Sequence, residues 1–169
     1  MTLNKKPVNE KLKQSFLYVI SRYDDKETLG ITKICKLLYF ADFNYYKKNN
    51  IAITGTDYLR WEHGPLPSGI YEVISELKDE GKISITDREL NDEIIQKEFT
   101  IVEEQNFDYI SDKEKRELDK VLDKLGRKTG AELERLSHLD TPWEVTLPRK
   151  KIKYKLVFYR DDNIALLVE

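Results

Sequence analysis

The sequence predicts a mainly helical α+β fold: a compact helical domain with a small antiparallel β-sheet and a winged-helix-like strand and hairpin element. Apolar residues recur at helical spacing in five segments, whereas only a few short segments alternate as strands do. At 169 residues the chain is long enough for one ordinary domain and too short for two comfortable ones, and its 40% of hydrophobic residues is enough to build a substantial core. We therefore expect residues 1–169 to form a single domain.

Two helices are predicted in the N-terminal third of the chain. Residues 9–23 carry apolar side chains at helical spacing, and residues 24–26 end this pattern. Residues 30–46 are more apolar, which predicts the central helix of the fold. On a helical wheel this second helix has one narrow polar stripe, and the rest of its circumference is expected to be buried. The stripe consists of Lys33, Lys36, Asn44 and Lys47.

The middle of the chain predicts a strand followed by a helix. Residues 57–62 favour a strand because they are rich in aromatic side chains, and His63-Gly64-Pro65 is expected to end it. Ser68 is the predicted N-cap of the helix. This helix is expected to close at Gly81, because glycine is typical of left-handed caps.

Residues 82–86 and 97–102 alternate as two strands of a loose, exposed hairpin. Together with the preceding elements they give the order of a winged helix, which raises a DNA-binding hypothesis. Charge argues against this hypothesis, because the recognition helix and the wing would carry carboxylates that phosphate repels. These carboxylates are Glu72, Glu76, Asp79, Glu80, Asp87, Glu89, Asp92 and Glu93.

Two capping boxes predict helices in the C-terminal half. Residues 111–114 begin a helix that stops at Gly126, and residues 129–132 begin a helix that must end before Pro142. After Pro148 the apolar residues fit both a strand and a helix, and the helix is the favoured interpretation.

Composition limits the classes of function. The 29 basic and 31 acidic residues give a formal charge of −2, so no general attraction to nucleic acid or to anionic lipid is expected. The single cysteine, Cys35, excludes an internal disulfide and indicates a small buried side chain in a reducing compartment. Because no apolar stretch is long enough to span a membrane and residues 1–10 do not resemble a signal peptide, we expect a cytoplasmic protein. No metal-binding, cofactor-binding or catalytic motif occurs, so we expect no cofactor and no enzymatic activity.

Two residues of the predicted central helix are unusual for their positions. Asp42 falls on the apolar face, where an ionised carboxylate must be paired. The favoured interpretation is a structural pair with Arg60, His63 or a tyrosine, in preference to a catalytic role. Phe40 falls within the polar stripe. It is either an exposed aromatic side chain of an interface, or it is covered by the N-terminal helix or the C-terminal tail.

The densest cluster of aromatic and rigid residues spans residues 58–67. Gly64 and Pro65 form a rigid turn there. Such a turn can present Trp61 or His63 to a partner at a small entropic cost, which favours an interface. The alternative is a plain corner between a strand and a helix.

Several short motifs follow one another along the chain. They are Lys36-Leu37-Leu38-Tyr39-Phe40-Ala41-Asp42, Thr54-Gly55, Tyr58, Trp61-Glu62-His63-Gly64-Pro65, Ile70-Tyr71 and Thr141-Pro142-Trp143. In order and spacing they resemble the SocA-like, or Panacea, antitoxin domain. The resemblance covers about residues 10–145 and leaves residues 146–169 as a variable tail.

The resemblance implies an antitoxin of bacteria, phages or mobile elements that neutralises a cognate protein toxin by direct contact. Some relatives deliver the toxin to a protease such as a Clp-type machine. The expected partner-binding residues are Phe40, Tyr58, Trp61, Glu62, His63, Pro65 and Tyr71. The expected structural residues of the motif are Tyr39, Asp42, Gly55, Gly64, Pro142 and Trp143.

Three hypotheses remain at this level. The favoured one is a toxin-binding antitoxin, which is compatible with a homo-oligomer. The first alternative is a winged-helix-like DNA-binding regulator. The third is an enzyme that uses Asp42 and His63, which would require both side chains to line an open pocket.

Overall fold

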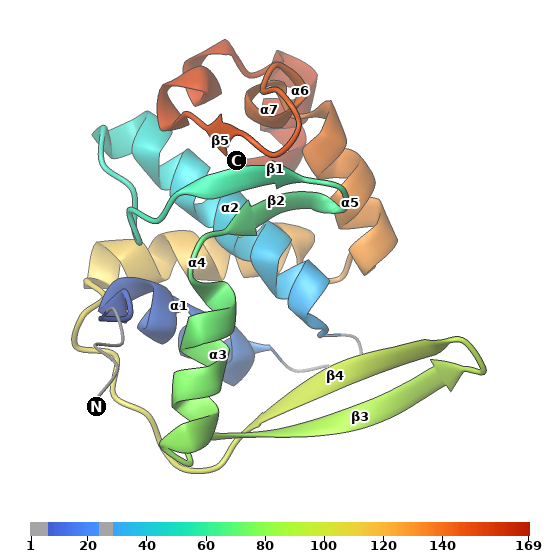
Figure 1. The fold of residues 1–169 in the computed structure, drawn as a ribbon. Coiled ribbons are helices and arrows are strands. Elements are labelled where there is room, and N and C mark those ends of the chain that lie inside the picture. Colours follow the sequence, from blue (N-terminus) through green and yellow to red (C-terminus); the bar gives the residue numbers. More distant parts are fainter. Residues whose placement is uncertain (1–6, 24–28) are drawn as a thin grey trace, which may run out of the picture.

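The central helix of the fold is α2 (Ile31–Asn49), as the sequence predicts. The computed structural model describes residues 7–23 and 29–169, so the predicted break at residues 24–26 lies outside the described residues. Several helices and the three-stranded sheet pack around α2, and the whole forms a mainly helical α+β fold with small antiparallel sheets, which confirms the predicted class (Figure 1).

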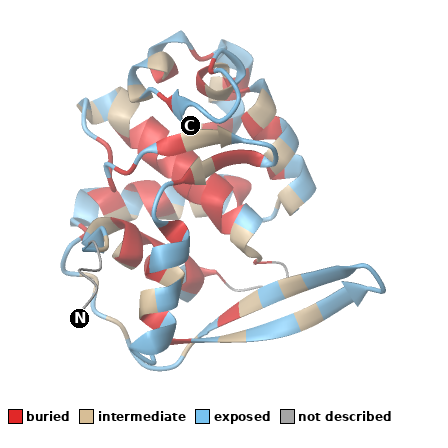
Figure 2. Ribbon diagram, in the orientation of Figure 1, coloured by how far each residue is buried: buried red, intermediate tan, exposed pale blue. Residues whose placement is uncertain are grey.

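The polar stripe predicted on α2 is wrong. Every residue from 33 to 45 is buried, and Figure 2 shows α2 as the most continuously buried element of the fold. Helix α4 (Asp112–Leu125), helix α5 (Gly130–Leu139) and the C-terminal segment pack against it. Two residues of the stripe bond to the C-terminal segment: Asn44 donates a hydrogen bond of 2.6 Å to the carbonyl of Val168, and Lys47 forms an ion pair of 2.8 Å with Glu169.

Helix α1 (Glu10–Arg22) agrees with its predicted bounds, and Asn9 caps it by accepting a hydrogen bond from the backbone of Leu12. Both predicted capping boxes are confirmed at the starts of α4 and α5. Ser111 and Thr129 each accept from the backbone three residues later, and each glutamate returns a bond to the cap. Local sequence alone specifies these helix starts.

A three-stranded antiparallel sheet lies across α2 in the order β2-β1-β5 (Figure 1). Its central strand β1 (Tyr58–Trp61) matches the predicted strand. The strand ends before His63, as predicted, but Gly64 and Pro65 do not belong to the turn: the chain turns at residues 62–63 and continues as β2 (Gly64–Pro67), a strand that was not predicted, with Trp61 opposite Gly64. Two prolines are tolerated in β2 because it is an edge strand that need not donate every ladder hydrogen bond.

Helix α3 (Ile70–Asp79) has Gly69 as its N-cap, with φ +87°, so the predicted cap at Ser68 is wrong. The carbonyl of Ser68 instead accepts a hydrogen bond from the hydroxyl of Thr56. Gly81 has φ +70°, which is the left-handed conformation expected after this helix.

The strands of the second sheet are longer than predicted. They are β3 (Ile83–Asn91) and β4 (Ile94–Ile101), and only residues 92–93 connect them. The Asn91 side chain closes this turn by accepting from two backbone N–H groups, so the connection is tight and the predicted loose loop is wrong. The hairpin extends away from the helical body and is largely exposed, as predicted (Figures 1 and 2).

The C-terminal tail is mostly helical, as the favoured interpretation predicts. After α6 (Thr141–Glu144) it forms strand β5 (Lys151–Ile152), the 3-10 helix η2 (Tyr154–Tyr159) and helix α7 (Asp162–Val168). Strand β5 pairs with β1, and η2 packs on α2. The tail is therefore built into the same core as the motif residues.

Candidate functional site

A small hollow of about 140 Å³ lies where the β1–β2 turn meets the start of α2. We call it the β1–β2 hollow. Helix α2 forms one side, the turn forms the other, and Tyr71 of α3 closes one edge. The residues that matter for its chemistry are Lys36, Trp61, His63, Gly64, Pro65 and Tyr71.

Exposed side chains surround this hollow. The Trp61 side chain is 41% exposed and that of Tyr71 is 61% exposed. The guanidinium of Arg149 lies 5.4 Å from the centre of the Trp61 ring, and His63 approaches Glu134 of α5 at 3.3 Å. We define the rim surface as the exposed residues Trp61, Glu62, His63 and Tyr71. The rim surface thus exposes two large aromatic side chains, one of which, Trp61, packs against Arg149.

The turn is fixed by close packing at Gly64. Its φ of +108° disfavours any residue with a side chain. A Cβ atom there would lie 2.7 Å from Cε of Lys36 and 2.8 Å from Oγ of Ser137. Glycine at this position therefore allows the hairpin to pack directly on α2 and α5.

Lys36 lies at the base of the hollow. Its residue surface is only 3% exposed, and within the described residues its ammonium has no hydrogen bond and no ion pair. Burial lowers the pKa of Lys36, while the nearby carboxylate of Glu134 partly opposes this shift. The hollow is thus lined by a largely buried, unpaired lysine and by two exposed aromatic rings.

Asp42 belongs to the core and is separate from the hollow. It is 1% exposed and accepts three hydrogen bonds, from the backbone N–H of Thr54 at 2.8 Å and from the hydroxyls of Thr54 and Tyr58 at 2.6 Å each. Burial raises the pKa of Asp42, and these hydrogen bonds oppose that rise. Pairing with a tyrosine is one of the predicted arrangements and is confirmed. Arg60 and His63, the other predicted partners, contact other residues.

The sequence model of one family, described as the antitoxin SocA-like, Panacea domain, matches residues 34–144. The chain belongs to the SocA-like antitoxin family. This agrees with the resemblance expected from the motifs, and the family is generally non-enzymatic. Searches of curated proteins and of solved structures gave no match.

The predicted partner-binding residues of this Panacea domain fall into an exposed and a buried group. Trp61, Glu62, His63 and Tyr71 are exposed around the hollow, and Pro65 is buried in its wall. Phe40 and Tyr58, however, are 0% exposed. Of the two alternatives for Phe40, the covered one is confirmed, and its assignment to an exposed interface is wrong, because the C-terminal tail packs over the next turn of α2, where Asn44 bonds to Val168.

The predicted structural residues of the Panacea domain have individual explanations. Tyr39 donates a hydrogen bond of 2.7 Å to Asp140, and Pro142 lies in the first turn of α6. Gly55 has φ +66°, which suits glycine. The Trp143 ring stacks on His138 at 4.0 Å, and the Arg60 guanidinium lies 4.0 Å above the same indole ring.

Two important cations of this protein, Lys36 and Arg160, were not among the predicted site residues. Lys36 was assigned to a solvated stripe, although its place inside the apolar run of residues 34–43 was a signal of burial. Arg160 lies in the tail beyond the family match, and its side chain is 0% exposed. Nothing local in the sequence distinguishes it from a surface arginine.

Three further features were considered in the described part of this Panacea domain: a cysteine nucleophile, a metal site and a membrane-spanning helix. Burial raises the pKa of the Cys35 thiol to about 12, which makes it a poor nucleophile. No three histidine, cysteine or carboxylate side chains among the described residues are grouped as a metal site requires. None of the described helices combines the length and apolar character needed to cross a membrane.

Proposed function

We propose that this chain is an antitoxin that neutralises a cognate protein toxin by direct binding through the rim surface. The observation that carries the proposal is the pair of exposed aromatic side chains, Trp61 and Tyr71, beside a hollow in a chain of an antitoxin family. Large aromatic side chains next to a pocket are typical energetic anchors of protein interfaces.

The packing behind the rim surface favours binding. Gly64 fixes the β1–β2 turn against α2, and Arg149 lies beside the Trp61 ring. Because the turn is already ordered, little conformational entropy is lost when a partner binds. The hollow of about 140 Å³ is also smaller than the roughly 300–1,000 Å³ that drug-sized ligands occupy. It suits one side chain of a protein partner better than a small-molecule substrate.

The DNA-binding alternative is disfavoured by the surface of α3 and of the β3–β4 hairpin. Helix α3 and the residue after it expose Glu72, Asp79 and Glu80. The hairpin exposes Asp87, Glu89, Asp92 and Glu93. A surface of this charge repels phosphate, so a winged-helix mode of DNA binding would lack its main source of affinity.

The enzyme alternative requires Asp42 and His63 to meet in an open pocket. Asp42 is buried and bound to Thr54 and Tyr58, whereas His63 is exposed and contacts Glu134. Delivery of the toxin to a Clp-type protease, as in some relatives, would require a further surface in addition to the rim surface.

Co-expression tests the proposed function. The product of each gene beside the one that encodes this chain is induced alone and together with this chain. A neighbouring product that stops growth alone, but not together with this chain, and that co-purifies with it, supports the proposal. Toxicity that this chain leaves unchanged contradicts it.

Replacing Trp61 with alanine is expected to raise the Kd for that toxin about 30-fold, which corresponds to roughly 2 kcal/mol for an aromatic anchor. Tyr71→Ala should also weaken binding, and calorimetric titration measures both effects. Tyr109→Ala is the matched control, because Tyr109 is a 58% exposed tyrosine outside the rim surface. Equal Kd values for Trp61→Ala, Tyr71→Ala and the control would show that the toxin binds elsewhere.

A further inference from the structure

Lys36 differs from the other buried cations of this protein. Within the described residues four cationic side chains are buried, and three of them have partners. Lys13 binds Glu76 and Glu80, Lys33 donates to the hydroxyl of Tyr23, and Arg160 forms an ion pair with Asp140. The ammonium of Lys36 has neither a hydrogen bond nor an ion pair with a described residue.

Lys36 is largely shielded from water, and a charge in such a place without a partner is unfavourable, so the free protein carries a free-energy cost at Lys36. A bound anion would remove that cost. Glu134 is the carboxylate that acts on Lys36 from α5, but it contacts His63 and forms no ion pair with Lys36. Cys35, the other titratable neighbour on α2, is a buried neutral thiol. The charge of Lys36 is therefore left for a group from outside the chain.

The hollow above Lys36 is suited to a carboxylate. None of its lining residues is acidic, and His63 and Lys36 both supply possible donors. Trp61 and Tyr71 border it with aromatic surface that can cover the aliphatic part of an inserted side chain. Its volume of about 140 Å³ fits one side chain.

We propose that the β1–β2 hollow is a carboxylate-binding pocket, in which the ammonium of Lys36 receives one aspartate or glutamate side chain of the toxin. This proposal rests on the proposed function, and it names the chemistry of the group that the rim surface recognises. Trp61 and Tyr71 of the rim surface provide contact area, and the charge of Lys36 makes the pocket selective for an acidic side chain.

The test compares Lys36→Met with Lys13→Met, using the toxin that the wild-type chain neutralises. Methionine keeps most of the aliphatic volume and removes the charge. Lys36→Met is expected to raise the Kd about 30-fold or more, because a buried charge of the toxin then has no partner. Its Tm should equal or exceed that of the wild-type protein. Lys13→Met should lower the Tm, because Lys13 has two carboxylate partners.

A scan of the toxin identifies the inserted side chain. Each surface aspartate and glutamate of the toxin is changed to asparagine or glutamine, and its Kd is measured with the wild-type chain and with Lys36→Met. One toxin substitution should weaken binding to the wild-type chain, and it should cause little further loss in Lys36→Met. Glu134→Gln, tested in parallel, should leave the Kd within about threefold of the wild-type value.

The outcomes separate the two proposals. If the wild-type chain neutralises the toxin and Lys36→Met binds it as tightly, the carboxylate pocket is overturned while the antitoxin function stands. A drop in Tm for Lys36→Met like that of Lys13→Met assigns Lys36 a structural role and also overturns the pocket. The same holds if no toxin carboxylate is coupled to Lys36. Failure of the wild-type chain to bind any neighbouring product overturns the proposed function itself.

Discussion

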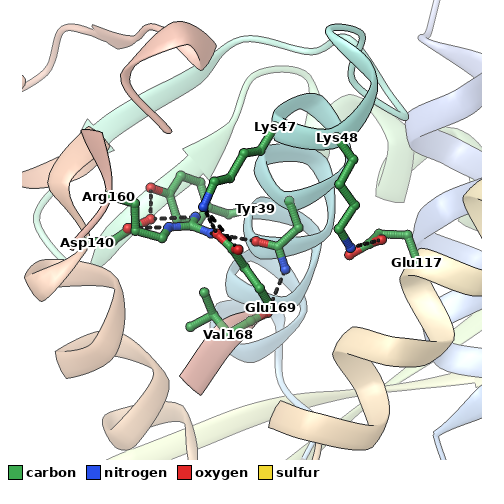
Figure 3. Close-up of polar contacts among 9 residues, drawn as sticks. Tyr39, Lys47, Lys48, Glu117, Asp140, Arg160, Val168 and Glu169 are labelled. Carbon is green, nitrogen blue, oxygen red and sulfur yellow. Dashed lines mark hydrogen bonds and ion pairs between the residues drawn. The ribbon is translucent and has the colours of Figure 1, made fainter. Parts of the chain in front are cut away.

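Replacing Arg160 with methionine is expected to lower the free energy of unfolding by about 3–5 kcal/mol, the largest effect of any single substitution considered for this protein. The guanidinium of Arg160 is fully buried and forms a bidentate ion pair with Asp140, at 2.7 and 2.9 Å. It also donates to Asn44 at 2.6 Å and to Glu169 at 3.0 Å (Figure 3).

The size of this effect follows from what the substitution leaves behind. Asp140 is 0% exposed, and without Arg160 its carboxylate retains the hydroxyl of Tyr39 as its remaining side-chain donor. A buried charge that loses its counterion is much less stable than the intact pair. The same guanidinium joins α2, the residue between α5 and α6, and Glu169 at the end of the last helix, so the packing of the tail weakens with it.

Denaturant titration of the purified protein measures the change in the free energy of unfolding, and the accompanying drop in Tm is expected to be on the order of 10 °C. Arg116→Met is the matched control, because Arg116 is exposed on α4. It should change stability by no more than about 0.5 kcal/mol. If Arg160→Met unfolds at the same denaturant concentration as this control, the buried ion pair does not hold the tail in place.

Arg160 also shows which parts of this fold the sequence could predict. The capping boxes at Ser111 and Thr129 are local, because each side chain bonds to the backbone three residues later, and both were predicted. The partners of Arg160 on α2 and beside α5 lie 116 and 20 residues away. No local pattern indicates that Arg160, which follows the basic residues of 149–155, becomes the centre of a buried network.

The same distinction explains the error on α2. A helical wheel groups Lys33, Lys36 and Asn44 correctly on one face, but it cannot tell whether that face meets water or another part of the chain. Here the face is covered from far away in sequence, for example by Val168, which lies 124 residues after Asn44. The lysine at the base of the hollow was therefore assigned to the surface.

Strand β2 was missed for a different physical reason. Pro65 and Pro67 normally argue against a strand, because proline cannot donate to a ladder hydrogen bond. They are compatible with β2 because it lies at the edge of the sheet, which is a property of the assembled fold. A turn was predicted at Gly64 and Pro65, one to two residues after the observed turn at residues 62–63, and the exposure of Trp61 beside it agrees with the side chain that this turn was expected to present.

Replacing Asp42 with alanine is the second substitution for which a large effect is expected, a loss of about 3 kcal/mol in the free energy of unfolding. The carboxylate accepts from the backbone of Thr54 and from two hydroxyls, those of Thr54 and Tyr58. Alanine would leave these buried donors without an acceptor, and each unsatisfied group costs about 1–3 kcal/mol. The hydroxyl of Thr54 can turn toward another acceptor, so the full sum is not expected.

Asp57→Ala is the control for this experiment, because it removes a carboxylate from the same part of the chain. Asp57 is about half exposed and pairs with Lys151 at the surface at 2.6 Å, which is worth at most about 1 kcal/mol. Tyr58→Phe adds a second check. It removes one donor to Asp42, so its effect and that of Asp42→Ala should be less than additive when the two are combined.

The comparison with toxin binding decides what Asp42 does. Because Asp42 and Tyr58 are buried and Trp61 is exposed beside the β1–β2 turn, the two kinds of substitution should affect different measurements. Asp42→Ala should lower the Tm and leave the Kd of the remaining folded protein close to the wild-type value. Trp61→Ala should raise the Kd and leave the Tm close to the wild-type value. A normal Tm for Asp42→Ala, together with a lost neutralising activity, would contradict the structural role and would make this carboxylate part of the functional site.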